Sequence, residues 1–203
     1  MATQEITAAR VKELREKTNA GMMDCKRALQ ETGGDFDEAV KILRERGMAQ
    51  AGKLAARETT EGRVEAYVHG TKIGVLLEVG CNTDFVARND EFGAFCKDVA
   101  MHIAAMAPKY VSRDEVPQAD IDAELEIFKS QAADKPEPVR EKIAEGKLNK
   151  WYSEVVLLDQ PWIRGKELKG KDVTIEELRQ EVASTSGENV QIRRFTRFAL
   201  GEQ

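Results

Sequence analysis

The chain has few of the residues that carry metal and redox chemistry. Among 203 residues it has three cysteines and two histidines. Cys25, Cys81 and Cys96 form no CxxC pair, and neither His69 nor His102 stands at zinc-ligand spacing from a cysteine. We therefore expect reduced, partly buried thiols, no metal site and no cofactor. A catalytic cysteine–histidine pair stays open as the less favoured alternative.

Long apolar runs are also missing. The longest, Val75 to Val79, contains Glu78 and is far shorter than the roughly 20 residues of a membrane span. Residues 1–10 lack the apolar core of a signal peptide. We expect a cytoplasmic protein with no membrane partner.

A basic surplus is absent, because 31 Lys and Arg stand against 36 Asp and Glu, a formal net charge of −5. General nucleic-acid binders normally displace counterions from phosphate with a positive surplus. The balance therefore argues against direct nucleic-acid binding, and the mixed surface charge suits a protein partner.

Motifs of the common enzyme classes do not occur. There is no GxxxxGK[ST], GxGxxG, HExxH or GxSxG pattern. The acidic clusters have the spacing of solvated helix faces. The residues themselves predict no enzyme active site.

The first fifty residues predict a small helical bundle. Val11 and Leu14 begin one apolar stripe at helical spacing, and Met22, Cys25 and Leu29 form a second. A capping-box pattern over residues 35–38 opens a third helix, which Gly47 is expected to end.

The remaining residues predict a sheet flanked by helices. Residues 63–68 alternate as a half-buried strand, and residues 73–81 read as a more buried strand after a Gly-Thr-Lys turn. A helix is expected to run from Asn89 or Asp90 to Ala107. A last strand over residues 190–200 should turn Val190, Ile192, Thr196, Phe198 and Leu200 to one face. The fold class is α+β, with a bundle and connector in residues 1–56 and an α+β core in residues 57–203.

Two short segments carry exposed-looking apolar residues. In the loop over residues 82–90, Phe85 either packs beneath the following helix as a hydrophobic staple or projects as an anchor for a partner. Met22 and Met23 are adjacent, so both cannot face the core of one helix. Met22 fits the inward stripe and Met23 is expected to be exposed, where a flexible thioether suits an adaptable interface.

These two segments resemble the signatures of the elongation factor Ts family, the guanine-nucleotide exchange factors of elongation factor Tu. The first signature is LREKTNAGMMDCKRAL, residues 14–29, and the second is EVGCNTDFVAR, residues 78–88. Residues 150–163 and 187–195 also resemble the family, so the likeness covers nearly the whole chain. Gly80 and Asn82 depart from the usual family residues but leave TDFV intact.

The resemblance implies the roles of particular residues. The N-terminal helices would form a bundle like a ubiquitin-associated domain that docks on elongation factor Tu through Lys12, Arg15, Met22 and Met23. The exchange loop would be Thr83, Asp84, Phe85 and Val86, which inserts near the nucleotide site, disturbs Mg²⁺ and phosphate binding and promotes GDP release. No covalent chemistry is implied, so no residue is catalytic.

The resemblance also bears on assembly. Short family members can act as homodimers, whereas long members carry a second subdomain and a coiled-coil insertion. Because no long heptad stretch occurs here, we expect that insertion to be absent. The alternative function is a ubiquitin-associated-like adaptor without exchange activity, which would leave residues 63–200 unexplained.

Overall fold

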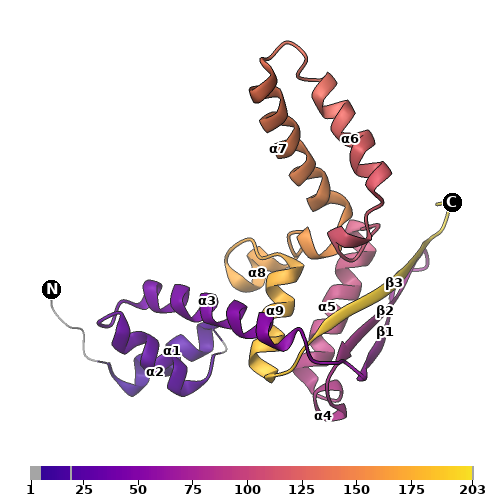
Figure 1. Cartoon of the computed structure of the whole chain (residues 1–203). Coiled ribbons are helices and arrows are strands. Elements are labelled where there is room, and N and C mark those ends of the chain that lie inside the picture. Colours follow the sequence, from indigo (N-terminus) through magenta and orange to yellow (C-terminus); the bar gives the residue numbers. More distant parts are fainter. Residues whose placement is uncertain (1–5, 19, 203) are drawn as a thin grey trace. The chain divides into compact units, whose positions relative to one another are not determined.

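A computed structural model describes residues 6–18 and 20–202, apart from the side chains of residues 48, 50 and 51 (Figure 1). Helices and one three-stranded antiparallel sheet confirm the α+β class.

The chain divides into two compact units, each built from segments distant in sequence. The division at residues 56 and 57 stays a prediction. The first unit comprises Met1–Arg63, Gly80–Phe95 and Glu177–Gln191, and the second Val64–Val79, Cys96–Glu176 and Ile192–Gln203.

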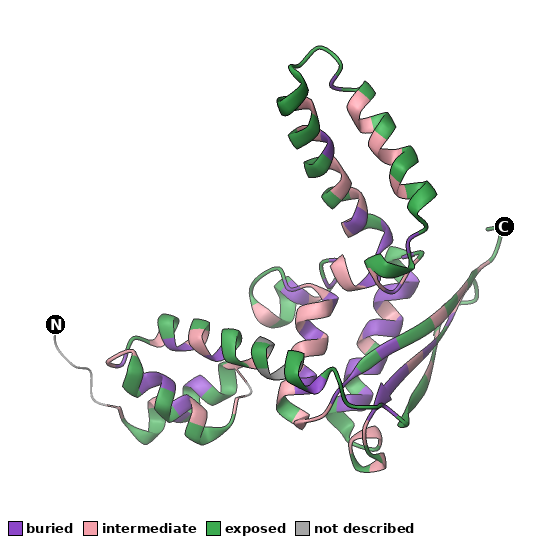
Figure 2. Ribbon diagram, viewed as in Figure 1, coloured by how far each residue is buried: buried purple, intermediate pink, exposed green. Residues whose placement is uncertain are grey.

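Three helices form the predicted N-terminal bundle: α1 (Ala8–Thr18), α2 (Met22–Glu31) and α3 (Phe36–Leu54). Their inward residues recur at three- and four-residue spacing, so each helix buries one stripe against the other two (Figure 2). The buried residues of this cluster are Val11, Leu14, Cys25, Ala28, Leu29, Ala39 and Leu43.

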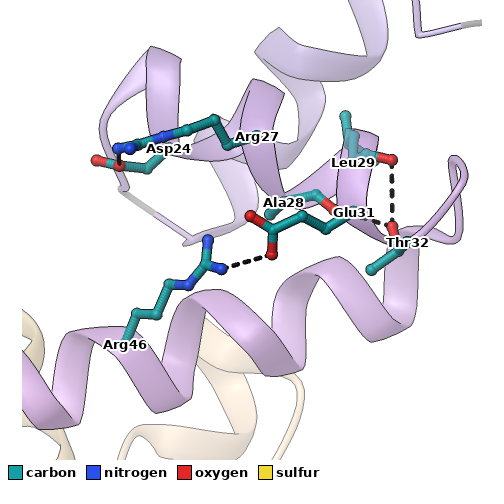
Figure 3. Close-up of polar contacts among 7 residues, drawn as sticks. All are labelled: Asp24, Arg27, Ala28, Leu29, Glu31, Thr32 and Arg46. Carbon is teal, nitrogen blue, oxygen red and sulfur yellow. Dashed lines mark hydrogen bonds and ion pairs between the residues drawn. The ribbon is translucent and has the colours of Figure 1, made fainter.

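An ion pair joins α2 to α3, and a threonine hydroxyl contacts the end of α2 (Figure 3). The guanidinium of Arg46 on α3 donates to the carboxylate of Glu31 on α2. The hydroxyl of Thr32 donates to the backbone oxygen of Ala28 at 3.0 Å and to that of Leu29 at 3.3 Å. The hydroxyl adds to the backbone bonds that already close the end of α2, from the N–H of Thr32 to Ala28 and from that of Gly34 to Leu29.

The expectation that Gly47 ends the third helix is wrong, since α3 continues to Leu54. A glycine in a helix interior costs only about 1 kcal/mol relative to alanine, which packing readily offsets. A Cβ at Gly47 would lie 3.4 Å from the hydroxyl oxygen of Ser184, and Arg44 forms an ion pair with Glu177. Contacts with a distant segment of the same unit therefore carry the helix past its local stop signal.

The predicted hairpin and last strand form the sheet. Its strands β1 (Glu61–His69), β2 (Ile73–Cys81) and β3 (Gln191–Ala199) lie in the order β1-β2-β3. On β2, Val75, Leu77 and Val79 are buried, whereas the intervening Leu76 is exposed. Helix α5 (Asp90–Met106) begins as predicted and ends one residue before the predicted end. Arg197 on β3 donates from Nε to the backbone oxygen of Ala104 at 3.3 Å, which places the inner face of the sheet against α5.

The prediction that the even-numbered residues of β3 share one face is wrong for the second half of the strand. Ile192 is buried, but Phe198 is 71% exposed and Leu200 is 79% exposed. Up to Ile192 the even-numbered residues of this segment face inward, whereas from residue 195 onward the odd-numbered residues do. Between them, both Arg193 and Arg194 reach the carboxylate of Glu78. Strict alternation over the whole strand therefore misassigns the end of β3.

Two long helices lie side by side, and the absence of the coiled-coil insertion of long family members stays a prediction. Helices α6 (Gln118–Ser130) and α7 (Glu137–Val155) run antiparallel and join through a short turn (Figure 1). Helix α7 continues through Gly146 without a break. Few of their residues are fully buried (Figure 2).

The remaining elements are short or connect these layers. None of the helices in the described ranges combines the length and the apolar character that crossing a bilayer requires. The short and connecting elements are α4 (Asp84–Ala87), η1 (Arg113–Glu115), η2 (Leu157–Asp159), α8 (Gly165–Lys169) and α9 (Ile175–Ser186).

A buried histidine joins α5 to the segment after α7. His102 is fully buried, its Nδ1 accepts from the backbone N–H of Ile163 at 3.2 Å, and its Nε2 lies 2.9 Å from Oε1 of Gln160. Because Nδ1 accepts, the ring is neutral and Nε2–H donates to Gln160. Burial lowers the pKa of His102 to about 4, against the opposing effect of the Gln160 hydrogen bond.

We expect this histidine to make the fold sensitive to acid. The folded state binds fewer protons than the unfolded state between the unfolded pKa of 6.5 and the folded value of about 4. Stability is therefore full above pH 6.5 and falls, by at most about 3 kcal/mol, as the pH drops toward 4. Denaturant unfolding across this window measures the loss.

Two variants separate this histidine from other titrating groups. His102→Asn, which keeps an acceptor near the position of Nδ1, should be less stable at neutral pH but show a flatter pH profile. His69→Gln should keep the wild-type slope. Equal slopes in the wild type and His102→Asn would contradict the assignment.

Candidate partner-binding site

The TDFV segment forms a single capped turn. Thr83 has an extended backbone and caps α4, where its hydroxyl oxygen accepts from the backbone N–H of Val86 at 3.4 Å. The carboxylate of Asp84 forms an ion pair with Arg88 at 3.1 Å, one turn along the chain. This stretch is therefore an ordered structure with fixed side-chain directions.

Phe85 projects from this turn into solvent. Its side chain is 84% exposed, whereas Phe92, seven residues later on α5, is 1% exposed. The staple interpretation of Phe85 is therefore wrong, and of the two alternatives the structure favours the projecting one. A large exposed aromatic on an ordered turn is typical of a partner-binding anchor, because it buries a large area with little loss of side-chain entropy.

A carboxylate behind the turn was missed by sequence reasoning. Glu188 follows α9, and its Oε2 accepts from the backbone N–H groups of Asn82 and Thr83, each at 3.0 Å. Its Oε1 accepts from the hydroxyl of Thr83 at 2.6 Å. Glu188 follows a glycine that marks the end of a helix and lies in the family-like segment over residues 187–195, but neither signal shows what its side chain reaches.

Two asparagines extend this network. Asn82 accepts at Oδ1 from the backbone N–H of Asn189 at 2.9 Å and donates from Nδ2 to the backbone oxygen of Glu58. Asn189 is buried and donates to the backbone oxygens of Ala55 at 3.2 Å and Arg57 at 2.8 Å. Asn82, one of the two departures from the family pattern, thus links three segments of the first unit.

The cysteines do not resemble activated nucleophiles. Burial raises the pKa of Cys25 and of Cys81, and the Glu188 carboxylate raises that of Cys81 further. Both groups therefore favour the protonated thiol, and Cys81 donates to the backbone oxygen of Thr83 at 3.2 Å. Among the described residues, no group of three His, Cys, Asp or Glu is placed to hold a metal ion.

The second predicted set of residues lies on the bundle. Lys12 and Arg15 are exposed three residues apart on α1, and Lys12 pairs with Glu16 at 3.7 Å. Met23 is 64% exposed, as predicted, but Met22 is 43% exposed and does not face the core. It occupies the first position of α2, at the open end of the stripe that Cys25 and Leu29 continue. Asn19 of the first signature lies outside the described residues.

Both predicted sets belong to the first compact unit. Together they present two methionines, one phenylalanine and two basic side chains on ordered elements. Exposed apolar residues on rigid elements are typical of a protein that binds another macromolecule. The fold and site therefore define an α+β binding factor.

Comparison with known proteins identifies the family. A family model described as "Elongation factor TS" matches residues 2–173. The chain is 53% identical over 198 residues to an elongation factor Ts of Thermodesulfovibrio yellowstonii, covering 97% of each chain. It is 56% identical over 201 residues to one of Anaeromyxobacter sp., covering 98% of this chain and 90% of the relative. The chain belongs to the elongation factor Ts family of translation elongation factors.

Proposed function

We propose that this protein is the guanine-nucleotide exchange factor of elongation factor Tu and that its exchange loop is Thr83, Asp84, Phe85 and Val86. The observation that carries the proposal is the 84% exposure of Phe85 on a capped turn. Family membership supports nucleotide exchange on elongation factor Tu as the general role.

The loop acts as a wedge. A GTPase holds its nucleotide through a phosphate-binding loop and a Mg²⁺ ion that bridges the phosphates. Burying Phe85 in a pocket of the partner supplies roughly 1.5–3 kcal/mol, which is available to shift the elements that support the Mg²⁺ ion. The shift weakens phosphate binding, and GDP leaves.

Displacement by GTP follows from linkage. If the factor weakens nucleotide binding, nucleotide weakens factor binding by the same free energy. Arriving GTP therefore releases the factor. The cycle forms and breaks no covalent bond in this chain, needs no cofactor and takes place in the cytoplasm, with no direct contact to nucleic acid or membrane.

The bundle supplies the docking surface in this proposal. Met22 and Met23 are exposed at the start of α2, and Lys12 and Arg15 are exposed on α1. Flexible thioethers fill irregular gaps on a partner, and the basic side chains favour an acidic neighbour. Affinity then comes from the bundle and distortion from the loop.

Phe85→Ala should slow factor-stimulated GDP release by about tenfold or more, because truncation removes the buried wedge. Stopped-flow release of a fluorescent GDP from elongation factor Tu measures the rate. Thermal unfolding should be unchanged, since Phe85 lies in solvent. Phe92→Ala is the contrasting variant, with a loss of about 3–5 kcal/mol of stability. A normal release rate with Phe85→Ala would reject the wedge.

Met23→Asp should weaken the complex with elongation factor Tu by about tenfold or more, because it places a charge in an apolar contact. Isothermal titration calorimetry with nucleotide-free partner measures the affinity. Val139→Asp, on the exposed face of α7, is the matched control and should bind normally. Thermal stability should be unchanged in both variants. Wild-type affinity in Met23→Asp would show that the bundle docks through other residues.

We further propose that the free protein forms a homodimer through the outer face of the sheet. Within the described residues, β1, β2, the end of β3 and the turn after it leave five large apolar side chains exposed on this face. An open hollow lies at one end of it, lined in part by Val68, Phe198 and Leu200. A second copy offers the same apolar surface, so a two-fold pairing is self-complementary. The five residues are Val64, Val68, Leu76, Phe198 and Leu200.

Phe198→Arg should convert the dimer to a monomer, because pairing would bury two unpaired guanidinium groups. Sedimentation equilibrium measures the mass. Ile127→Arg, an equivalent change on the exposed part of α6, is the control and should remain dimeric. A monomeric wild-type protein at micromolar concentration would reject this assembly.

A further inference from the structure

We propose that Glu188 is the positioning residue of the exchange loop, and that its carboxylate holds the loop in the conformation that presents Phe85. The inference rests on the proposed function of that loop. Glu188 lies outside the TDFV motif, and its part is to orient the loop.

The carboxylate accepts three hydrogen bonds from two consecutive residues. The backbone N–H groups of Asn82 and Thr83 both reach Oε2 at 3.0 Å, and the hydroxyl of Thr83 reaches Oε1 at 2.6 Å. Bonds to an ionised acceptor are roughly twice as strong as neutral ones. Both oxygens are engaged, so the group fixes the position of the loop and its orientation.

The Thr83 hydroxyl connects the Glu188 carboxylate to the turn that carries Phe85. It donates to Glu188, and its oxygen accepts from the backbone N–H of Val86, the bond that caps α4. Donating to a carboxylate increases the electron density on the hydroxyl oxygen, which strengthens its acceptance of the Val86 N–H. The direction of the Phe85 side chain, between Asp84 and Val86, is set by this turn.

Glu188 is itself held by its neighbours. Gly187 adopts a left-handed backbone with φ of 71° at the end of α9, and its N–H donates to the backbone oxygen of Ala183 at 3.0 Å. Buried Asn189 is tied to the backbone oxygens of Ala55 and Arg57. The carboxylate therefore projects from a rigid helix end, as an element that orients a functional loop must.

Preorganisation gives this contact its functional value. A loop that samples many conformations must be ordered when it inserts, and this cost reduces the free energy available to distort the partner. If only a fraction of molecules holds the competent conformation, the apparent affinity falls by that fraction. A loop clamped in the free protein avoids this loss.

The test compares Glu188→Gln with the wild type and with Glu126→Gln, a matched change at an exposed position of α6. Glutamine keeps the size of the side chain but loses the charge, and its single oxygen can accept at most two of the three bonds. Amide hydrogen exchange at Asn82 and Thr83 should become roughly tenfold faster or more. The second-order rate constant for factor-stimulated GDP release should fall by a similar factor.

Coupling to Phe85 separates positioning from general support of the fold. If Glu188 acts through Phe85, Glu188→Gln should cost less than about twofold in a Phe85→Ala background, because the group that it positions is gone. Equal fold losses in both backgrounds would overturn the proposal. So would wild-type release and wild-type amide exchange in Glu188→Gln.

The same variants distinguish this inference from the proposed function. If Phe85→Ala leaves GDP release unchanged, the wedge function fails, and the positioning role in exchange fails with it, even if amide exchange in Glu188→Gln shows the clamp. If Phe85→Ala slows release but Glu188→Gln does not, the exchange loop stands and the positioning role is overturned.

Discussion

The hydrogen bonds between the TDFV loop and Glu188 join segments that lie more than one hundred residues apart. The backbone N–H groups of Asn82 and Thr83 are 106 and 105 residues from the carboxylate that accepts from them. The neighbouring residue, Asn189, donates hydrogen bonds to backbone oxygens of the connector after α3. Because these donors have acceptors only in the folded unit, the loop takes its shape when the unit folds.

This arrangement lets one short segment combine order with exposure. Phe92 is buried on α5, whereas Phe85 stands in solvent on a turn that polar contacts hold from behind. An aromatic without such a frame would fold back onto nearby apolar surface, because burial in its own chain would be favourable. The polar network thus accompanies an apolar group that stays exposed at the surface.

Local patterns predicted the kinds of elements well and their ends less well. The bundle, the hairpin and α5 formed where helical spacing and alternation placed them. Helix α3 passed Gly47 and α7 passed Gly146, because propensity differences near 1 kcal/mol are smaller than packing contributions. On β3 the phase change lies where Arg193 and Arg194 both reach Glu78 across the sheet. Such cross-strand contacts leave no mark on the alternation of a single strand.

The amino-acid sequence alone determined the α+β class, the three-helix bundle and the TDFV segment, because these depend on spacing and on short motifs. It left open whether Phe85 packs inward or projects, and it assigned no role to Glu188. Tertiary structure decided both. The direction of a loop side chain depends on acceptors supplied by distant segments, and no local periodicity encodes which carboxylate will reach two amides more than one hundred residues away.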